Sequence, residues 1–164
     1  MNRLEGKNAV VTGAGRGLGA AIAVSFAKEG ARVLVADVDL SSAEQVVDQI
    51  RAMGGEGTPV SADVTSADDV GRMMDALTDR YGRIDILVNN AGIASQGSVT
   101  DLPEEDWDRV MEVNIKGAYL CSRAAIPQMK EVGAGSIICV SSASGVIGQR
   151  DRWPTTSPST HSLA

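Results

Sequence analysis

The 164-residue sequence has little of what several protein classes require. It contains two cysteines and one histidine, and neither cysteine has metal-type spacing, so we expect no bound metal and no disulfide. Basic residues are also in the minority, since 15 lysines and arginines face 21 aspartates and glutamates. The resulting net charge of −6 argues against a nucleic-acid partner or an anionic membrane surface.

Long apolar runs are missing as well. No stretch approaches the roughly 18 apolar residues that span a bilayer. The first residues, MNRLEGKNAVV, lack the apolar stretch of a signal peptide. Cys121 and Cys139 both lie in apolar surroundings, which is typical of reduced, buried thiols. We therefore expect a cytoplasmic protein without a membrane partner.

Short β-branched runs alternate with amphipathic stretches along the chain. Helices are expected over 18–30, 41–55, 66–82 and about 104–131, and strands over 8–13, 31–37, 57–64, 84–92 and 135–142. Strands that alternate with helices predict right-handed crossovers and a parallel sheet. The continuous apolar strands suit a sheet covered on both faces. The predicted fold class is α/β, an open doubly wound parallel sheet of the Rossmann type that stops after the fifth strand.

The second predicted helix carries both a start signal and an apolar face. Ser41 and Glu44 have the spacing of a capping box, which would begin the helix at Ser41. The residues expected on its buried face are Ala43, Val46, Val47, Ile50 and Met53.

A glycine-rich turn follows the first predicted strand. The segment TGAGRGLG over 12–19 has the pattern T-G-x-x-x-G-x-G, formed by Thr12, Gly13, Gly17 and Gly19. Glycines there allow a tight turn and a close approach of backbone to a pyrophosphate at a helix N-terminus. The alternative is a merely flexible loop, but the position between a strand and a helix favours a dinucleotide site.

An acidic residue ends the second predicted strand. Asp37 lies 18 residues after Gly19, where a carboxylate can bind the 2′-hydroxyl of an adenosine ribose and repel a 2′-phosphate. This position favours NAD as the cofactor, with NADP less favoured. Arg16 in the glycine turn instead favours NADP, because a basic residue there can bind a phosphate. Asp37 as a simple solvated carboxylate is the remaining alternative.

Taken in order, these motifs resemble those of the short-chain dehydrogenase/reductase family over residues 5–148. The resemblance rests on TGAGRGLG, Asp37, Asp63–Val64, NNAG over 89–92, Asn114 and the serine pair 141–142. It implies a pyrophosphate and ribose site at the turn, an adenine pocket, and residues under the cofactor. The cofactor-binding residues so implied are Gly13, Arg16, Gly17, Leu18, Gly19, Asp37, Asp63, Val64, Asn90, Ala91 and Gly92.

The same resemblance implies two catalytic-site residues. Asn114 would bend its helix and hold a water in a proton relay, and Ser142 would bind the substrate carbonyl or hydroxyl. The implied activity is NAD(P)-dependent interconversion of a secondary alcohol and a carbonyl. Structural roles remain open for each: a helix irregularity for Asn114, a strand-end hydrogen bond for Ser142, and turn-forming amides in NNAG.

The family's Tyr-x-x-x-Lys pair is absent, since no tyrosine follows Tyr119 and no lysine follows Lys130. Residues 1–150 are therefore interpreted as an incomplete dinucleotide-binding domain, and 151–164 as an irregular tail rich in Ser, Thr and Pro. Read one base out of step, the codons of residues 152–159 are compatible with V-A-Y-x-x-S-K, which suggests a frameshift. A natural C-terminal sequence and a cloning remnant are the alternatives.

Two functional hypotheses follow from this sequence. The first is an oxidoreductase acting on a small-molecule alcohol or carbonyl, and the second is a catalytically inactive dinucleotide-binding fragment. An uncovered apolar fifth strand would leave a sheet edge that invites association. We expect the family's homo-oligomer to be impaired and the chain to be marginally stable.

Overall fold

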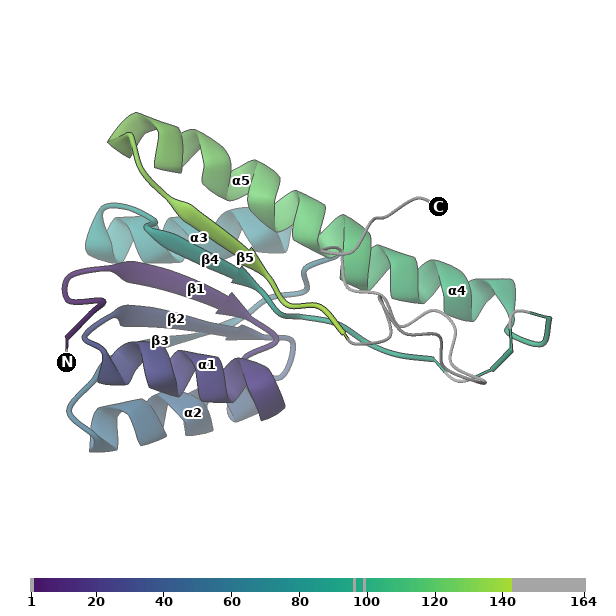
Figure 1. Ribbon diagram of the computed structural model, residues 1–164, viewed down its shortest axis with the longest axis horizontal. Helices are drawn as coiled ribbons and strands as arrows, with labels where there is room; N and C mark the ends of the chain where they lie inside the picture. The colour runs from purple at the N-terminus through teal and green to yellow at the C-terminus, as the bar shows by residue number, and fades with distance from the viewer. Residues whose placement is uncertain (1, 96, 99, 143–164) are drawn as a thin grey trace.

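The computed structural model describes residues 2–95, 97–98 and 100–142. Their strands form one parallel sheet in the order β3-β2-β1-β4-β5, with helices on both faces (Figure 1). The order reverses direction at β1 and β4, which lie side by side although they are far apart in sequence. The predicted α/β class and parallel sheet are confirmed. The irregular tail over 151–164 lies outside the described residues.

The chain alternates strands and helices throughout. Its first half comprises β1 (Asn8–Thr12), α1 (Gly17–Lys28), β2 (Arg32–Asp37), α2 (Leu40–Ala52) and β3 (Glu56–Ser61). The second half comprises α3 (Ala67–Tyr81), β4 (Ile86–Asn89), α4 (Glu104–Met111), the π-helix η1 (Glu112–Lys116), α5 (Gly117–Val132) and β5 (Ser136–Cys139).

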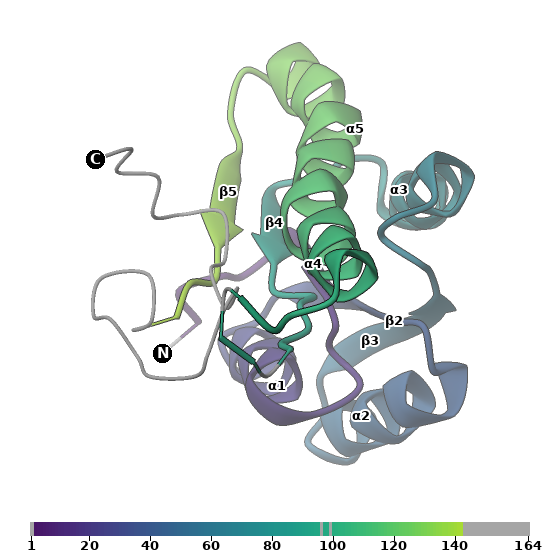
Figure 2. The ribbon, with the colours of Figure 1, turned by 90° about the vertical axis from the view of Figure 1, so that its right-hand side faces the viewer.

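Alternate residues of the central strands build two separate cores. Val11 and Val33 face α1 and α2, whereas Val10 and Leu34 face α3 and α5. Figure 2 shows these two helical layers on opposite sides of the sheet. All five residues of β1 are buried, as expected for a central strand covered on both faces. The two layers fix the sheet and leave its carboxyl edge for a binding site.

Two details of the predicted elements are wrong. The cap of α2 is Asp39, whose carboxylate accepts hydrogen bonds from the backbone N–H groups of Ser41 and Ser42, so the predicted Ser41–Glu44 box does not form. Asp39 caps the helix because a carboxylate at this earlier position reaches the free N–H groups of the first turn. Met53 follows the last turn of α2 and is exposed, because the helix ends before it could join the buried face.

The single helix expected over 104–131 is interrupted. It begins at Glu104 as α4, widens into the π-helical turn η1, and continues as α5 to Val132. The two helices remain nearly collinear and extend past the carboxyl edge of the sheet (Figure 1). An inserted π turn shifts the face that the helix presents, and such turns are frequent at functional sites.

Candidate functional site

A cleft of about 650 Å³ opens at the carboxyl ends of the strands, the position where open parallel sheets bind ligands. It lies beside the β1–α1 turn and reaches from the end of β2 to α4 and η1. Its lining comprises Thr12, Gly13, Arg16, Leu18, Gly19, Ala36, Asp37, Val38, Ala62, Asp63, Val64, Thr65, Asn90, Ala91, Gly92, Ile93, Arg109, Glu112 and Val113.

The glycine turn packs directly on the segment after β4. Gly13 adopts φ +60°, and a Cβ placed there would lie 2.7 Å from the Cα of Ala91. A Cβ on Gly19 would overlap the Gly13 carbonyl oxygen and the Asn90 side-chain nitrogen. Only glycine fits these two positions, because the backbone of the turn approaches its neighbours too closely for any side chain.

A polar bracket joins β1 to the start of this segment. Thr12 Oγ1 accepts hydrogen bonds from the backbone N–H groups of Asn90 and Ala91, each at 3.1 Å, and donates to the Val88 carbonyl at 3.3 Å. The Asn90 side chain donates to the carbonyls of Thr12 and Gly13, each at 2.9 Å. Asn90 thus holds two chain segments together at the floor of the cleft.

Asp37 ends β2 on the wall of the cleft. Its Oδ2 accepts a 2.9 Å hydrogen bond from the Gly15 N–H, and its Oδ1 accepts a 3.1 Å hydrogen bond from the Asp39 N–H. The carboxylate is therefore fixed by both oxygens before any ligand arrives. Each carboxylate oxygen has lone-pair capacity left over, so the group can still accept from a further donor.

The adjacent part of the wall, just after β3, contains Asp63 and Thr65. Asp63 Oδ1 accepts from the Thr65 N–H at 2.9 Å and from the Thr65 hydroxyl at 2.8 Å. The Asp63 backbone N–H donates to Asp69 Oδ2 at 3.1 Å. Asp69 in turn belongs to the first turn of α3, where its N–H donates to the Ser66 cap. This wall is consequently anchored to the start of a helix.

Asn114 lies in the π turn η1 and is buried. Its Oδ1 accepts from the Ile93 N–H and its Nδ2 donates to the Ile93 carbonyl, both at 2.9 Å. This two-point contact clamps the segment after NNAG against the helix. Gly92 is close by, since a Cβ on it would lie 3.3 Å from Asn114 Oδ1. The expected irregularity of the helix at Asn114 is present.

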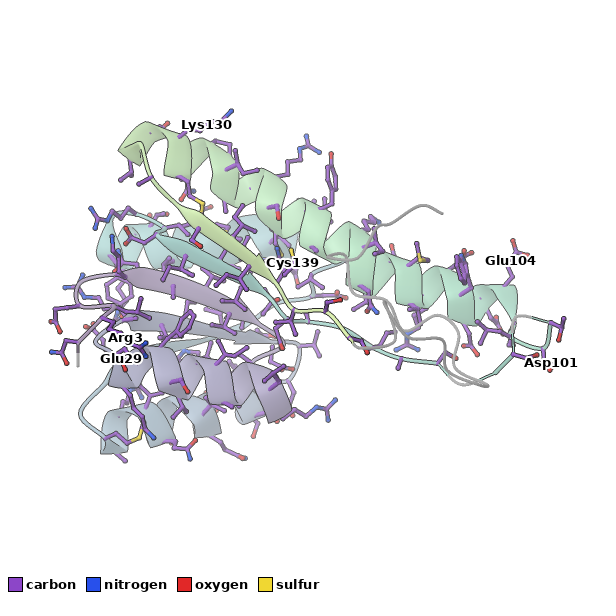
Figure 3. All side chains as sticks on the ribbon, viewed as in Figure 1. Arg3, Glu29, Asp101, Glu104, Lys130 and Cys139 are labelled. Carbon is purple, nitrogen blue, oxygen red and sulfur yellow. The ribbon has the colours of Figure 1, made fainter. Side chains whose placement is uncertain are left out.

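Ser142 follows β5 and is partly buried outside the lining of the cleft. Close to β5, the buried Asn89 side chain donates to Ser122 Oγ at 3.2 Å and to Cys139 Sγ at 3.7 Å. Asn89 Oδ1 has no hydrogen-bond partner within the described part of the chain. Figure 3 labels Cys139 on β5, the edge strand that pairs with β4.

The structure brings together most of the predicted cofactor residues. Ten of the eleven line the cleft, and Gly17 lies at the start of α1 outside that lining. Leu18 lines the cleft with 60% of its surface exposed. Asn114 forms part of the structural wall behind the cleft rather than its lining.

Sequence reasoning missed nine lining residues. Some could have been found, because they adjoin predicted ones at the strand ends: Thr12, Ala36, Val38, Ala62, Thr65 and Ile93. The other three, Arg109, Glu112 and Val113, come from the helical segment around the π turn. Nothing in their local sequence distinguishes them from other helical residues.

Hydrogen bonding and burial shift several pKa values. The pKa of the Asp39 carboxyl is lowered, chiefly by the Ser42 hydroxyl and backbone N–H and to a smaller extent by the charge of Arg16. The pKa of Asp69 is lowered, first by the Asp63 N–H and then by Ser66. Burial raises the pKa of the Cys121 thiol to about 12, so this thiol is unreactive.

Neither a metal centre nor a membrane span is present among the described residues. No group of three or more histidine, cysteine, aspartate or glutamate side chains is arranged there to hold a metal ion. In the same part of the chain, no helix has the length and apolar character needed to cross a membrane. Both cysteines are free thiols.

A cleft at the carboxyl edge of a parallel sheet, beside a glycine turn and a fixed strand-end carboxylate, is the arrangement of dinucleotide-binding proteins. The sequence profile of the short chain dehydrogenase family matches residues 7–154. The chain therefore belongs to the short-chain dehydrogenase/reductase family.

Individual relatives agree with this assignment. An uncharacterised oxidoreductase of Thermotoga maritima is 43% identical over 144 residues, covering 88% of this chain and 57% of the relative. A 3-oxoacyl-[acyl-carrier-protein] reductase of the same organism is 38% identical, with 89% and 59% covered. The chain thus spans less than two thirds of the length of these relatives.

Solved structures show the same fold. A short-chain dehydrogenase/reductase from Mycobacterium marinum superimposes with a TM-score of 0.88 at 38% identity, covering 92% of this chain and 60% of that one. A 7α-hydroxysteroid dehydrogenase in complex with NADH and 7-oxo glycochenodeoxycholic acid gives a TM-score of 0.87 at 35% identity, with 92% and 58% covered.

Proposed function

We propose that the cleft binds a nicotinamide dinucleotide, NAD in preference to NADP. We propose further that the protein interconverts a small secondary alcohol and a carbonyl in the cytoplasm. The observation that carries the proposal is the Asp37 carboxylate, held by the N–H groups of Gly15 and Asp39 at the wall of the cleft. A fixed carboxylate at this strand end accepts from ribose hydroxyls and repels a 2′-phosphate.

The glycine turn is the second support for a dinucleotide. Because Gly13 and Gly19 leave no room for a Cβ, the backbone itself forms the surface that a pyrophosphate would meet. The adjoining N-terminus of α1 has no side-chain cap and no acidic residue in its first turn. Its N–H groups are consequently available to an anion.

The remaining lining residues divide the cleft into two parts. Asp63 and Val64 would contact the adenine on the wall that Asp69 anchors, and Leu18 would cover the ribose and pyrophosphate. Asn90, Ala91 and Gly92 would form the floor below the nicotinamide half. Among them, Asn90 acts by holding the floor rigid, since both its side-chain hydrogen bonds go to the glycine turn.

A bound nicotinamide dinucleotide would supply or accept the hydride. The residues of this chain would then orient the substrate, and the proton would be exchanged with water, because the sequence has no tyrosine after Tyr119. Ser142 would donate a hydrogen bond to the substrate oxygen. Asn114 would act mainly through position, because both polar atoms of its side chain are engaged by Ile93. The substrate classes to test include the acyl thioester and the steroid named for two relatives.

The second candidate function is dinucleotide binding without turnover. The specific observation in its favour is the absence of any tyrosine after Tyr119 and of any lysine after Lys130 in this sequence. A positioned general acid contributes about 10²–10⁴-fold to such a reaction. Without one, binding would persist while turnover would be slow.

The first experiment is a fluorescence titration of the chain with NADH and with NADPH, for the wild type and Asp37→Asn. We expect the wild type to bind NADH more tightly than NADPH. In Asp37→Asn the ratio of the two affinities should fall about tenfold or more, because the charged hydrogen-bond acceptor is lost. Asp79→Asn on the exposed side of α3 is the matched control and should keep the preference. An unchanged ratio in Asp37→Asn would reject the assigned role of the carboxylate.

Turnover separates the two candidates. NADH consumption is followed with a panel of ketones, a steroid ketone and a 3-oxoacyl thioester. Consumption that depends on the carbonyl and falls in Ser142→Ala supports the oxidoreductase. Tight NADH binding with no consumption for any carbonyl supports the binding protein.

A further inference from the structure

We propose that Asp39 is a second residue that selects against a 2′-phosphate, by filling the N-terminus of α2 and by opposing the charge of Arg16. The inference rests on the proposed dinucleotide site and concerns the selectivity of that site. Asp37 alone leaves the selectivity unexplained, because Arg16 lines the same cleft and offers a phosphate a cation.

The N-terminus of α2 is the first element of the argument. A free helix N-terminus binds anions through its unpaired N–H groups. Here Asp39 Oδ1 accepts from the N–H groups of Ser41 at 3.1 Å and Ser42 at 3.4 Å. Asp39 Oδ2 accepts from the Ser42 hydroxyl at 2.6 Å. The donors that could hold an external phosphate are thus already taken by an internal carboxylate.

Asp39 is also tied to the ribose position. Its backbone N–H donates to Asp37 Oδ1, and the other Asp37 oxygen accepts from Gly15. Asp37 lines the cleft, and Asp39 lies just outside that lining, one backbone hydrogen bond away. In the proposed site, a group attached to the ribose at the 2′ position would meet the charge of Asp37 first and the charge of Asp39 behind it.

Arg16 belongs to the same corner of the cleft. It follows Gly15, which packs against the start of α2 so closely that a Cβ on Gly15 would lie 2.8 Å from the Cβ of Ser42. The positive charge of Arg16 contributes to lowering the pKa of Asp39, after the larger effect of the Ser42 and Ser41 hydrogen bonds. The two side chains form no ion pair, so in this proposal the Asp39 carboxylate weakens the attraction of this corner for a phosphate through its longer-range field.

The test is a double-mutant cycle with Asp39→Asn and Arg16→Ala, each titrated with NADH and NADPH. Asparagine is as good an N-cap as aspartate, so α2 keeps its start while the charge is lost. We expect Asp39→Asn to raise NADPH affinity about three- to tenfold at low ionic strength, with NADH affinity nearly unchanged. In the Arg16→Ala background this gain should be at most half as large. The guanidinium whose attraction for a phosphate Asp39→Asn would restore is absent there.

Two controls make the outcome specific. Asp48→Asn lies on the exposed face of the same helix and changes the net charge equally, so it should leave the NADPH-to-NADH ratio unchanged. Raising the salt concentration to about 0.5 M should shrink the gain in Asp39→Asn, since exposed charges are screened. A full gain that survives both salt and Arg16→Ala would overturn the proposed opposition of the Asp39 and Arg16 charges.

Failure of this inference differs from failure of the proposed function. If the wild type prefers NADH and Asp39→Asn leaves the ratio unchanged, the charge of Asp39 does not contribute to selectivity and the inference is rejected while the site stands. If neither dinucleotide binds to the wild type, the proposed function itself is rejected.

Discussion

Strands β1 and β5 are both short, parallel and rich in β-branched residues, and they end at the same edge of the sheet. β1 lies at the centre, with all its residues buried between two helical layers. β5 pairs with β4, and its Ile137 and Ile138 are 37% and 42% exposed. Two strands of similar composition therefore contribute very differently to the fold.

The difference shows that apolar sequence becomes stability only where neighbours cover both faces. Around β1, α1 and α2 cover one face while α3 and α5 cover the other. β5 packs chiefly against β4 and has no comparable helical cover among the described residues. We expect substitutions in the central strands to destabilise the fold strongly and substitutions in β5 to have a small effect. The uncovered β5 leaves the sheet with an apolar edge.

Thiol labelling gives the largest expected contrast. Cys121 is fully buried on α5 and its pKa is raised to about 12 by burial, whereas Cys139 on β5 is partly exposed. We expect a thiol reagent to modify Cys139 more than about 100-fold faster than Cys121, which must await unfolding. The measurement is reagent uptake over time, with Cys139→Ala as the control that removes the fast phase. Equal labelling rates for the two thiols would contradict the burial of Cys121.

Core truncation comes next. Leu34→Ala in the buried β2 should lower the free energy of unfolding by about 2–5 kcal/mol, because it leaves a cavity beside Val10 of β1. Ile138→Ala in β5 should lose only about 1 kcal/mol, since much of its side chain already meets water. Urea unfolding monitored by circular dichroism measures both. Equal losses would show that β5 is covered as well as β2.

A smaller effect is expected where β1 meets the segment after β4. Thr12→Val removes the hydroxyl that serves Asn90, Ala91 and Val88, and should cost about 1–3 kcal/mol through unsatisfied buried groups. Thr78→Val on α3 is the matched control, because its hydroxyl only bonds back to its own helix. The comparison uses the same urea unfolding curves, and a greater loss in Thr78→Val would refute the bracket.

The smallest effect concerns pH. The folded pKa of Asp69 is lowered by the Asp63 N–H and the Ser66 hydroxyl, so its contribution to stability is complete above its unfolded pKa of about 3.9. That contribution is lost as the pH falls through the lower folded pKa. Asp69→Asn should therefore reduce the slope of stability against pH below about 4. Thermal melts of Asp69→Asn and Asp79→Asn at several pH values measure this slope; identical slopes would contradict the assignment.

Prediction from sequence was most successful where local patterns control the structure. The expected strand over 8–13 and helix over 66–82 match β1 and α3 closely, and the apolar face of α3 is buried as its periodicity indicated. The strand expected over 84–92 stops at Asn89, because NNAG turns away from the sheet to form the floor of the cleft. The turn-forming asparagines and glycine of NNAG were the signal for that departure, and the predicted strand range did not use it.

The α2 cap and the π turn show a second limit. The sequence predicted a helix start at Ser41 from the Ser41–Glu44 spacing, and the path of the chain after β2 instead brings the Asp39 carboxylate to the free N–H groups. Likewise, the pattern over 104–131 predicted one helical stretch, and only the family resemblance at Asn114 indicated a bend in it. The contact of Asn114 with Ile93, 21 residues away in sequence, accompanies the wider turn.

The sequence by itself determined the order of strands and helices and the place of Asp37 at a strand end. It also determined the glycine positions of the turn, where the backbone approaches its neighbours closely. Local spacing controls these features, since residues two to four apart share a face or a turn. The tertiary structure alone decided that Arg109, Glu112 and Val113 line the cleft, and that β1 is buried while β5 is exposed. Clefts and burial arise from residues distant in sequence, and no local pattern encodes which of them meet.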